Sequence, residues 1–313
     1  MKKKSALLLG DITAPQGHML RGGDFPATRF ALHLVLIVCI PFFQLLTGCA
    51  TLKLTPVVSP PTGVYHQGKF VWYDLLTSDV AIARDFYGEL FGWSFKEQGR
   101  YTVVLNKAQP IGGMVEVQPK DGKDHAARWL ALLSVPDVDQ AAAMVLKGGG
   151  TVHEGPVDMK NRGRGALVSD PQGAHLVLLH SSSGDPVDTE PPMGAWLWVE
   201  LWSKDPKEAV AFYEELGGYS SVAGEEDYWF LWKDEWRGGV RFVPDEDLEV
   251  CWIPTVRVPD TVTIAEHAGK LGGQVLVQPQ DDSIGGSVAL IEDPTGGLLI
   301  VQRWSKQPSS TGE

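Results

Sequence analysis

Residues 79–92 read DVAIARDFYGELFG, and residues 205–218 read DPKEAVAFYEELGG. Seven of these fourteen positions are identical, at a constant offset of 126 residues. Further along, Asp170-Pro171-Gln172-Gly173 matches Asp293-Pro294-Thr295-Gly296 at an offset of 123. An offset that changes once, by three residues, indicates a duplicated domain in which one loop has been shortened.

Each copy is predicted to open with a strand and continue with a helix. The strands are expected at 71–76 and 197–202, where aromatic and branched residues are frequent. In the second copy Asp205 is a predicted N-cap, Pro206 occupies the first helical position and Glu208 completes a capping box. The strand and helix pattern restarts inside each copy, at 129–146 and 251–271. We therefore expect two β-α-β-β-β units per copy.

The combined pattern resembles the vicinal oxygen chelate (glyoxalase/bleomycin resistance/dioxygenase) superfamily. It consists of the opening strand, the motif Asp-x-x-x-Ala-x-x-Phe-Tyr-x-x-Leu-x-Gly, the pair Gly149-Gly150 and the Asp-Pro-x-Gly turn. The resemblance covers residues 68–182 and 194–305 and implies an α+β fold of two tandem domains. In each domain, two β-α-β-β-β units would form a cup-shaped mixed sheet whose concave face holds the site.

The N-terminal residues are typical of a secretory signal. An apolar run, Phe30–Leu46, follows Arg21 and Arg29 and ends in Leu46-Thr47-Gly48-Cys49, which looks like a bacterial lipobox. We expect Cys49 to be lipidated, which would anchor the protein to a membrane of the cell envelope, facing the periplasm or the exterior. An uncleaved transmembrane anchor is the alternative, and Met19 is an alternative start to Met1.

The predicted organisation has six parts. They are a signal peptide (1–48), a Pro-rich tether (49–67), the first domain (68–182), a linker (183–193), the second domain (194–305) and a disordered tail (306–313). We also expect the two domains to pack on each other. The net charge of −12 argues against a nucleic-acid partner, since phosphate binding requires a basic surface.

The resemblance implies three metal-ligand positions in each domain. One lies seven residues before the helix-capping Asp, one opens the second unit, and one follows the turn Asp by seven residues. In this chain they are Trp72, Leu130 and Val177 in copy 1, and Trp198, Ile253 and Ile300 in copy 2. None of these side chains is a metal ligand. No metal or other cofactor is therefore predicted, and a divalent ion on non-standard ligands remains the alternative.

A carboxylate recurs beside a tryptophan on both opening strands. Alternation places Asp74 on one face with Trp72, and Glu200 on one face with Trp198 and Trp202. These five residues are the predicted ligand-binding set. Asp74, Glu200 and His175, which has the parity of Val177, are the candidate catalytic residues. The carboxylates have three interpretations: a hydrogen bond to the backbone or a Trp indole, a general base or polar anchor, or a non-standard metal ligand.

A Gly-rich loop, Asn161-Arg162-Gly163-Arg164-Gly165, is expected at the rim of the copy 1 cup. Its arginines are interpreted either as part of a solvated loop or as a clamp for an anionic ligand. For the whole protein, we predict an envelope-anchored small-molecule-binding protein whose cup is lined by Trp and a carboxylate. An enzyme of glyoxalase or dioxygenase type, using carboxylate acid–base catalysis or unusual metal ligands, is the alternative. A structural lipoprotein is a third hypothesis.

Overall fold

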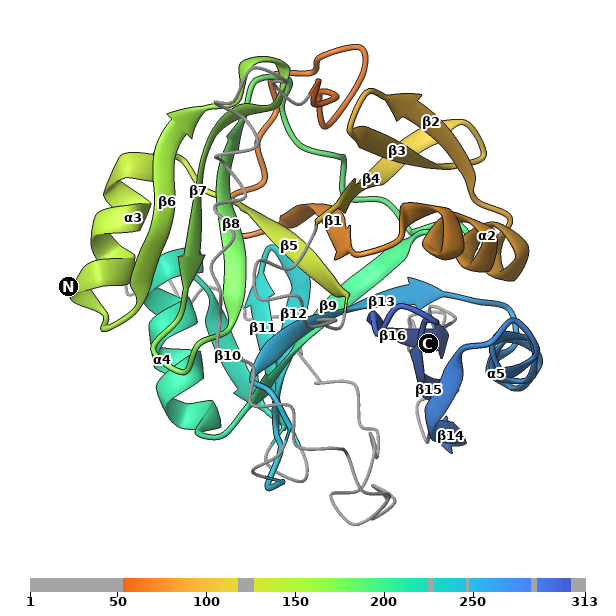
Figure 1. Ribbon diagram of the computed structural model, residues 1–313. Helices are drawn as coiled ribbons and strands as arrows, with labels where there is room; N and C mark the ends of the chain where they lie inside the picture. The colour runs from red at the N-terminus through yellow and green to blue at the C-terminus, as the bar shows by residue number, and fades with distance from the viewer. Residues whose placement is uncertain (1–52, 118–126, 225–227, 246–247, 283–285, 305–313) are drawn as a thin grey trace, which may run out of the picture.

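The computed structural model describes residues 53–117, 127–224, 228–245, 248–282 and 286–304, and it gives each copy its own eight-stranded sheet (Figure 1). The elements of copy 1 are β1 (Phe70–Thr77), α2 (Val80–Phe91), β2 (Ser94–Gln98), β3 (Tyr101–Asn106), β4 (Gln109–Glu116), β5 (Arg128–Ser134), α3 (Val138–Lys147), β6 (Thr151–Asp158), the short 3-10 helix η1 (Lys160–Arg162), β7 (Gly163–Ser169) and β8 (His175–Ser181). Those of copy 2 are β9 (Trp196–Ser203), α4 (Pro206–Gly217), β10 (Ser220–Ala223), β11 (Tyr228–Lys233), β12 (Glu235–Phe242), β13 (Cys251–Arg257), α5 (Thr261–Lys270), β14 (Gln274–Asp282), β15 (Gly286–Glu292) and β16 (Leu298–Arg303).

The two sheets have the same strand order. Copy 1 runs β2-β3-β4-β1-β5-β8-β7-β6, and copy 2 runs β10-β11-β12-β9-β13-β16-β15-β14. In both, the opening strand pairs in parallel with the last strand of its own unit and antiparallel with the first strand of the next unit. This arrangement confirms the predicted α+β fold, with two β-α-β-β-β units in each copy.

The duplicated motif forms the first helix of each copy as its residues require. Asp79 and Asp205 lie just before α2 and α4, and their carboxylates accept hydrogen bonds from first-turn backbone amides. Gly92 and Gly218 end these helices in the left-handed conformation, with φ values of 70° and 68°. The predicted N-cap and the position of Pro206 are thus confirmed.

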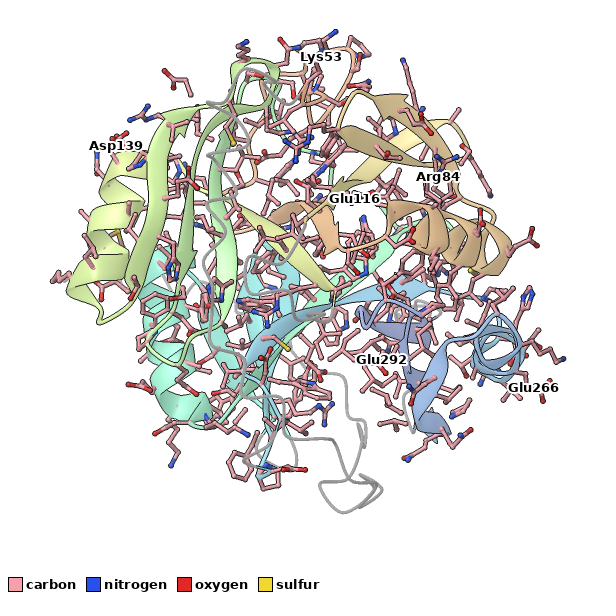
Figure 2. The ribbon with its side chains drawn as sticks, in the orientation of Figure 1. Lys53, Arg84, Glu116, Asp139, Glu266 and Glu292 are labelled. Carbon is pink, nitrogen blue, oxygen red and sulfur yellow. The ribbon has the colours of Figure 1, made fainter. Side chains whose placement is uncertain are left out.

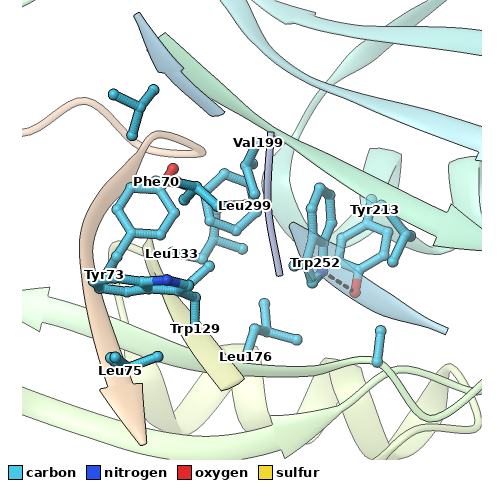
Figure 3. Close-up of a cluster of buried hydrophobic side chains, with 14 of the residues drawn as sticks. Phe70, Tyr73, Leu75, Trp129, Leu133, Leu176, Val199, Tyr213, Trp252 and Leu299 are labelled. Atoms are coloured by element: carbon cyan, nitrogen blue, oxygen red, sulfur yellow. Dashed lines mark hydrogen bonds between the residues drawn. The ribbon is translucent and has the colours of Figure 1, made fainter. Parts of the chain in front are cut away.

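Each of these helices packs against the other copy. α2 lies against α5 of copy 2, and α4 lies against α3 of copy 1. One hydrophobic cluster contains residues of both copies on the helix-bearing faces of the two sheets. Figure 3 shows its centre, where the Trp252 indole donates to the Tyr213 hydroxyl at 2.9 Å. The other face of each sheet is not covered by its own helices, and that face carries the candidate site.

The described residues include no helix long and apolar enough to cross a membrane. The apolar run 30–46 and the predicted lipidation site Cys49 lie outside the described residues.

Candidate functional site

The helix-free face of each sheet carries a cluster of inward-facing apolar residues. We call these faces the copy 1 cup and the copy 2 cup. The copy 1 cup includes Trp72, Tyr101, Val103, Val115, Leu130, Leu132, Met159, Leu167, Val177 and Leu179. The copy 2 cup includes Trp202, Val243, Cys251, Ile253, Val277, Val288, Leu290 and Ile300.

The Asp74 carboxylate lies at the floor of the copy 1 cup and is 2% exposed. Its Oδ1 accepts hydrogen bonds from the Tyr101 hydroxyl at 2.6 Å and from the Trp72 indole at 2.9 Å. The guanidinium of Arg162 lies 4.1 Å from the centre of the Trp72 ring and places Nη1 4.0 Å from Asp74 Oδ2. Arg162 Nη2 also donates to the Tyr101 hydroxyl at 3.1 Å. The carboxylate is therefore held by an indole, a phenol and a nearby cation.

Two residues of this network depend on a glycine opposite them. A Cβ on Gly113 of β4 would lie 2.0 Å from the Tyr101 hydroxyl oxygen and 2.6 Å from Asp74 Oδ1. Burial raises the pKa of Tyr101, so its hydroxyl keeps the proton that it donates to Asp74. Gly239 of β12 has the same relation to Tyr228 in copy 2, where a Cβ would lie 1.7 Å from the hydroxyl oxygen. In both copies, therefore, a tyrosine side chain packs directly over a glycine next to the buried acid.

Glu200 is the equivalent acid in copy 2 and is also 2% exposed. Its Oε1 accepts from Arg241 Nε at 2.6 Å and from the Trp202 indole at 3.1 Å. Arg241 Nη2 donates to Oε2 at 3.3 Å, so the arginine bridges both oxygens. Burial raises the pKa of Tyr228, and the negative charge of Glu200 raises it further. Each cup floor is therefore an internally compensated acid–arginine pair.

The arginine comes from a different element in each copy. Arg162 belongs to η1, in the second unit of copy 1, whereas Arg241 lies on β12, in the first unit of copy 2. At an offset of 126, the residue of copy 1 that corresponds to Arg241 is Val115. Each copy thus places a counter-charge beside its acid, but on a different element, and a buried carboxylate without a counter-charge is costly.

The tryptophans of the two cups differ in exposure. Trp72 is 1% exposed, whereas its counterpart Trp198 is half-buried. The Trp198 ring centre lies 6.4 Å from that of Tyr228 and 6.1 Å from that of Phe230. Trp236, also half-buried, continues this aromatic wall at 5.5 Å from Phe230. The copy 2 cup therefore presents partly exposed aromatic rings above its ion pair.

The copy 1 cup is covered by the chain itself. Leu54 and Val57 are buried in the same cluster as Trp72 and Tyr101. These residues belong to the segment that the sequence predicted to be a Pro-rich tether. Figure 1 shows the segment in orange, at the top of the view, between the strands β2–β4 and the strands β6–β8. This packing was not predicted. It occurs because the apolar side chains of Leu54 and Val57 are buried against the apolar face of the sheet.

His175, the third catalytic candidate, opens β8 and stacks on His153 with ring centres 4.7 Å apart. Burial is the main cause that lowers the pKa of His175 to about 4, and the positive charge of Arg128 adds to it. The imidazole is therefore neutral at pH 7. It lies on the strand two positions from β1 in the sheet order, so the structure does not bring it into the hydrogen-bonded network of Asp74.

The residues at the family's metal-ligand positions do not fit a metal ion. Leu130 and Val177 belong to the copy 1 cup cluster, and Ile253 and Ile300 belong to that of copy 2. At the remaining two positions stand Trp72 and Trp198, whose indoles are hydrogen-bond donors without a ligating lone pair. Within the described ranges, no group of three or more His, Cys, Asp or Glu side chains could hold a metal ion.

The structure adds residues that the sequence did not assign to the site. For Arg162 the interpretation as part of a solvated loop is wrong, because the side chain is 1% exposed inside the cup. Its neighbour Arg164 does lie at the surface, paired with Asp139, which is labelled at the left of Figure 2. Arg241 and Tyr101 were not predicted. For Arg241 the sequence signal is its parity with Gly239 on the same strand, and Tyr101 has no comparable signal.

Comparison with known proteins agrees with this geometry. The model of the Glyoxalase/Bleomycin resistance protein/Dioxygenase superfamily matches residues 69–178. The chain is 28% identical over 259 residues to "Putative glyoxylase CFP32" of Mycobacterium tuberculosis (strain CDC 1551 / Oshkosh), covering 79% of this chain and 99% of the relative. It is 25% identical over 269 residues to the anthracycline biosynthesis protein DnrV of Streptomyces peucetius, covering 79% and 98%.

Solved structures share the fold at low sequence identity. The Mn(II)-bound glyoxalase from Novosphingobium aromaticivorans superposes with a TM-score of 0.55 at 13% identity, covering 76% of this chain and 82% of that one. The 2,3-dioxygenase LapB from Pseudomonas sp. KL28 gives a TM-score of 0.54 at 13% identity, covering 80% and 96%.

Proposed function

Because the chain belongs to the glyoxalase/bleomycin resistance protein/dioxygenase superfamily, with two tandem domains of that family, we propose that it binds a small molecule in its copy 2 cup without a metal. The observation that carries this proposal is the contrast between two equivalent tryptophans. Trp198 is half-buried in an aromatic wall, whereas Trp72 is buried in the cluster that also contains Leu54 and Val57. The copy 2 cup is the one that offers surface to a ligand.

The wall favours a flat aromatic ligand. Aromatic side chains bind apolar ring systems by stacking, and a few polar groups fix the orientation of the ligand. Trp198 and Trp236 would supply stacking surface, and Arg241 would place a positively charged group at the base of the cup. Two relatives are anthracycline biosynthesis proteins, and an anthracycline is a fused-ring aromatic molecule. A polycyclic aromatic compound is therefore the ligand class that we propose.

Binding is favoured over catalysis by the state of the carboxylates. A general base needs a lone pair within reach of the proton that it removes. Both oxygens of Glu200 accept hydrogen bonds from Arg241, and the acid is buried. In Asp74, Oδ1 accepts from both Trp72 and Tyr101, and Oδ2 lies 4.0 Å from Arg162 Nη1. The glyoxalase-like or dioxygenase-like enzyme is the alternative function, and it would require these networks to open around a substrate.

We further propose that the protein acts in the cell envelope, anchored by lipid at Cys49. The support for this part is the basic, apolar and Leu-Thr-Gly-Cys pattern of residues 21–49.

Quenching of tryptophan fluorescence by an anthracycline, in buffer that contains a chelator, tests the ligand proposal. We expect Trp198→Leu to weaken binding at least about 10-fold, since the lost stacking and the lost buried area of the ring together should cost about 1.5 kcal/mol or more. The matched control is Trp229→Leu, on the same sheet but with its side chain packed against the opposite face, in the core. Equal loss in both variants, or recovery of binding only when a metal is added, would contradict the proposal.

A further inference from the structure

The segment 54–58 occupies the copy 1 cup as a bound peptide would. The chain leaves the outer surface at Lys53, labelled at the top of Figure 2, and buries Leu54 and Val57 against the cup cluster. It returns to the surface at Ser59. The two inserted side chains are 5% and 4% exposed, so they are as buried as core residues.

The segment also makes three polar contacts with the rest of the chain, two of them through its backbone. Arg162 Nε donates to the Thr55 carbonyl oxygen at 2.6 Å. The Val58 amide donates to the Ser183 hydroxyl at 3.1 Å, and the Thr55 hydroxyl donates to Gln98 Oε1 at 3.4 Å. Apolar pockets for side chains, combined with polar contacts to the main chain, are how proteins recognise an extended peptide.

Arg162 is the residue that suits this role best. The guanidinium is 1% exposed and stacks on Trp72. Its Nη1 makes no hydrogen bond within the described residues, although Asp74 Oδ2 lies 4.0 Å away. A buried guanidinium with an unused donor is costly unless it serves an acceptor in the cup. The acceptor held here, the Thr55 carbonyl oxygen, is bound by Nε, and Nη1 remains available to a further acceptor.

We propose that the copy 1 cup is a peptide-binding site whose ligand is the chain's own segment 54–58. The segment docks through Leu54, Val57 and the Thr55 carbonyl, and it closes the cup to small molecules. The equivalent floor in copy 2 has its arginine on β12, bound to both oxygens of Glu200. The proposal does not depend on which ligand the copy 2 cup binds.

The test uses the full chain and a labelled peptide of residues 53–59, Lys-Leu-Thr-Pro-Val-Val-Ser. The variant Leu54→Asp/Val57→Asp should expel the segment and bind the peptide at one molecule per chain. Wild-type protein should bind it at least about 100-fold more weakly, because a tethered competitor acts at an effective concentration in the millimolar range. Val64→Asp, at an exposed position of the same stretch, is the matched control and should behave as wild type. Arg162→Met, added to the expelled variant, should weaken peptide binding about 10-fold.

Two results would overturn the proposal. One is a folded Leu54→Asp/Val57→Asp variant, with wild-type circular dichroism, that does not bind the peptide. The other is equal peptide binding by wild type and variant. If the variant does not fold, a protease site inserted at the exposed residues Pro61–Thr62 of the wild-type chain replaces it. After cleavage the segment should co-elute with the protein and be displaced by excess free peptide. A segment that separates at once, or that excess peptide does not displace, contradicts docking.

Discussion

The hydroxyl of Tyr87 donates a hydrogen bond to Asp293 Oδ2 at 2.7 Å, from the first helix of copy 1 to the Asp-Pro-x-Gly turn of copy 2. The reverse pair exists as well, since Tyr213 donates to Asp170 Oδ2 at 3.0 Å. Each tyrosine also accepts a hydrogen bond from a tryptophan indole, Trp129 and Trp252 respectively. The two most recognisable motifs of the repeat therefore meet each other across the domain interface, once in each direction.

Removing either hydroxyl should destabilise the protein. Tyr87→Phe leaves the buried Asp293 without a donor to Oδ2, and Tyr213→Phe does the same to Asp170. We expect a loss of about 1–3 kcal/mol in the free energy of unfolding for each variant, measured by urea denaturation. The two losses should be similar because the contacts are related by the duplication. A change below about 0.5 kcal/mol in both would show that the interface does not depend on these pairs.

The acid–arginine pair of the copy 2 cup should be sensitive to loss of one partner. Arg241→Met leaves Glu200 buried without its counter-charge, and we expect about 3–5 kcal/mol of destabilisation in thermal or urea unfolding. Replacing both partners with apolar residues should cost less than the single change. The control is Arg164→Met, whose surface pair with Asp139 is screened by solvent and whose loss should leave the unfolding midpoint nearly unchanged. A double variant that is less stable than Arg241→Met would argue against this account.

The pH dependence of stability should carry a contribution from His175. Its pKa is lowered in the folded protein from 6.5 to about 4, mainly by burial. The unfolded chain therefore binds a proton at pH values where the folded protein does not. Stability from this residue is fully present above pH 6.5 and is lost as the pH falls toward 4, by up to about 3 kcal/mol. The variant His175→Leu carries leucine, the residue at the equivalent position 298 of copy 2. In this variant, the part of the stability loss at acid pH that comes from His175 should disappear. Identical acid profiles for variant and wild type would contradict the assignment.

The predicted lipid anchor can be tested by cell fractionation. Cys49→Ser should move the protein from the membrane fraction to the soluble fraction of the envelope, because the acyl chains would no longer be attached. The apolar run 30–46 is unchanged in this variant. If the variant still sediments with membranes, an uncleaved anchor replaces the lipoprotein hypothesis.

The fold could be predicted from the sequence because each signal was local and appeared twice. The caps Asp79 and Asp205, the terminal Gly92 and Gly218 and the strand alternation act over a few residues. The partners of Tyr87 and Tyr213 could not be predicted, because the repeat shows that the motifs recur but not that they meet between copies. Only tertiary packing brings together residues separated by 206 positions.

The site was predicted less completely. Parity placed Asp74 and Glu200 correctly in the cups, and the hydrogen bonds from Trp72 and Trp202 match the first of the three interpretations of these acids. The two arginines could not be predicted, because they do not occupy equivalent positions of the repeat. Arg162 lies in η1 and Arg241 lies on β12. The closure of the copy 1 cup by the chain could not be predicted either, since Leu54 and Val57 lie in a segment whose composition is typical of a tether.

One cup, that of copy 2, is proposed to bind a flat aromatic molecule without a metal. Isothermal titration calorimetry with an anthracycline, on metal-free protein and on the variants Trp198→Leu and Trp72→Leu, tests it most directly. We predict one binding site per chain, at least about 10-fold weaker binding in Trp198→Leu, and unchanged affinity in Trp72→Leu, whose side chain is 1% exposed. Two sites per chain, or a loss caused by Trp72→Leu and not by Trp198→Leu, would contradict the account.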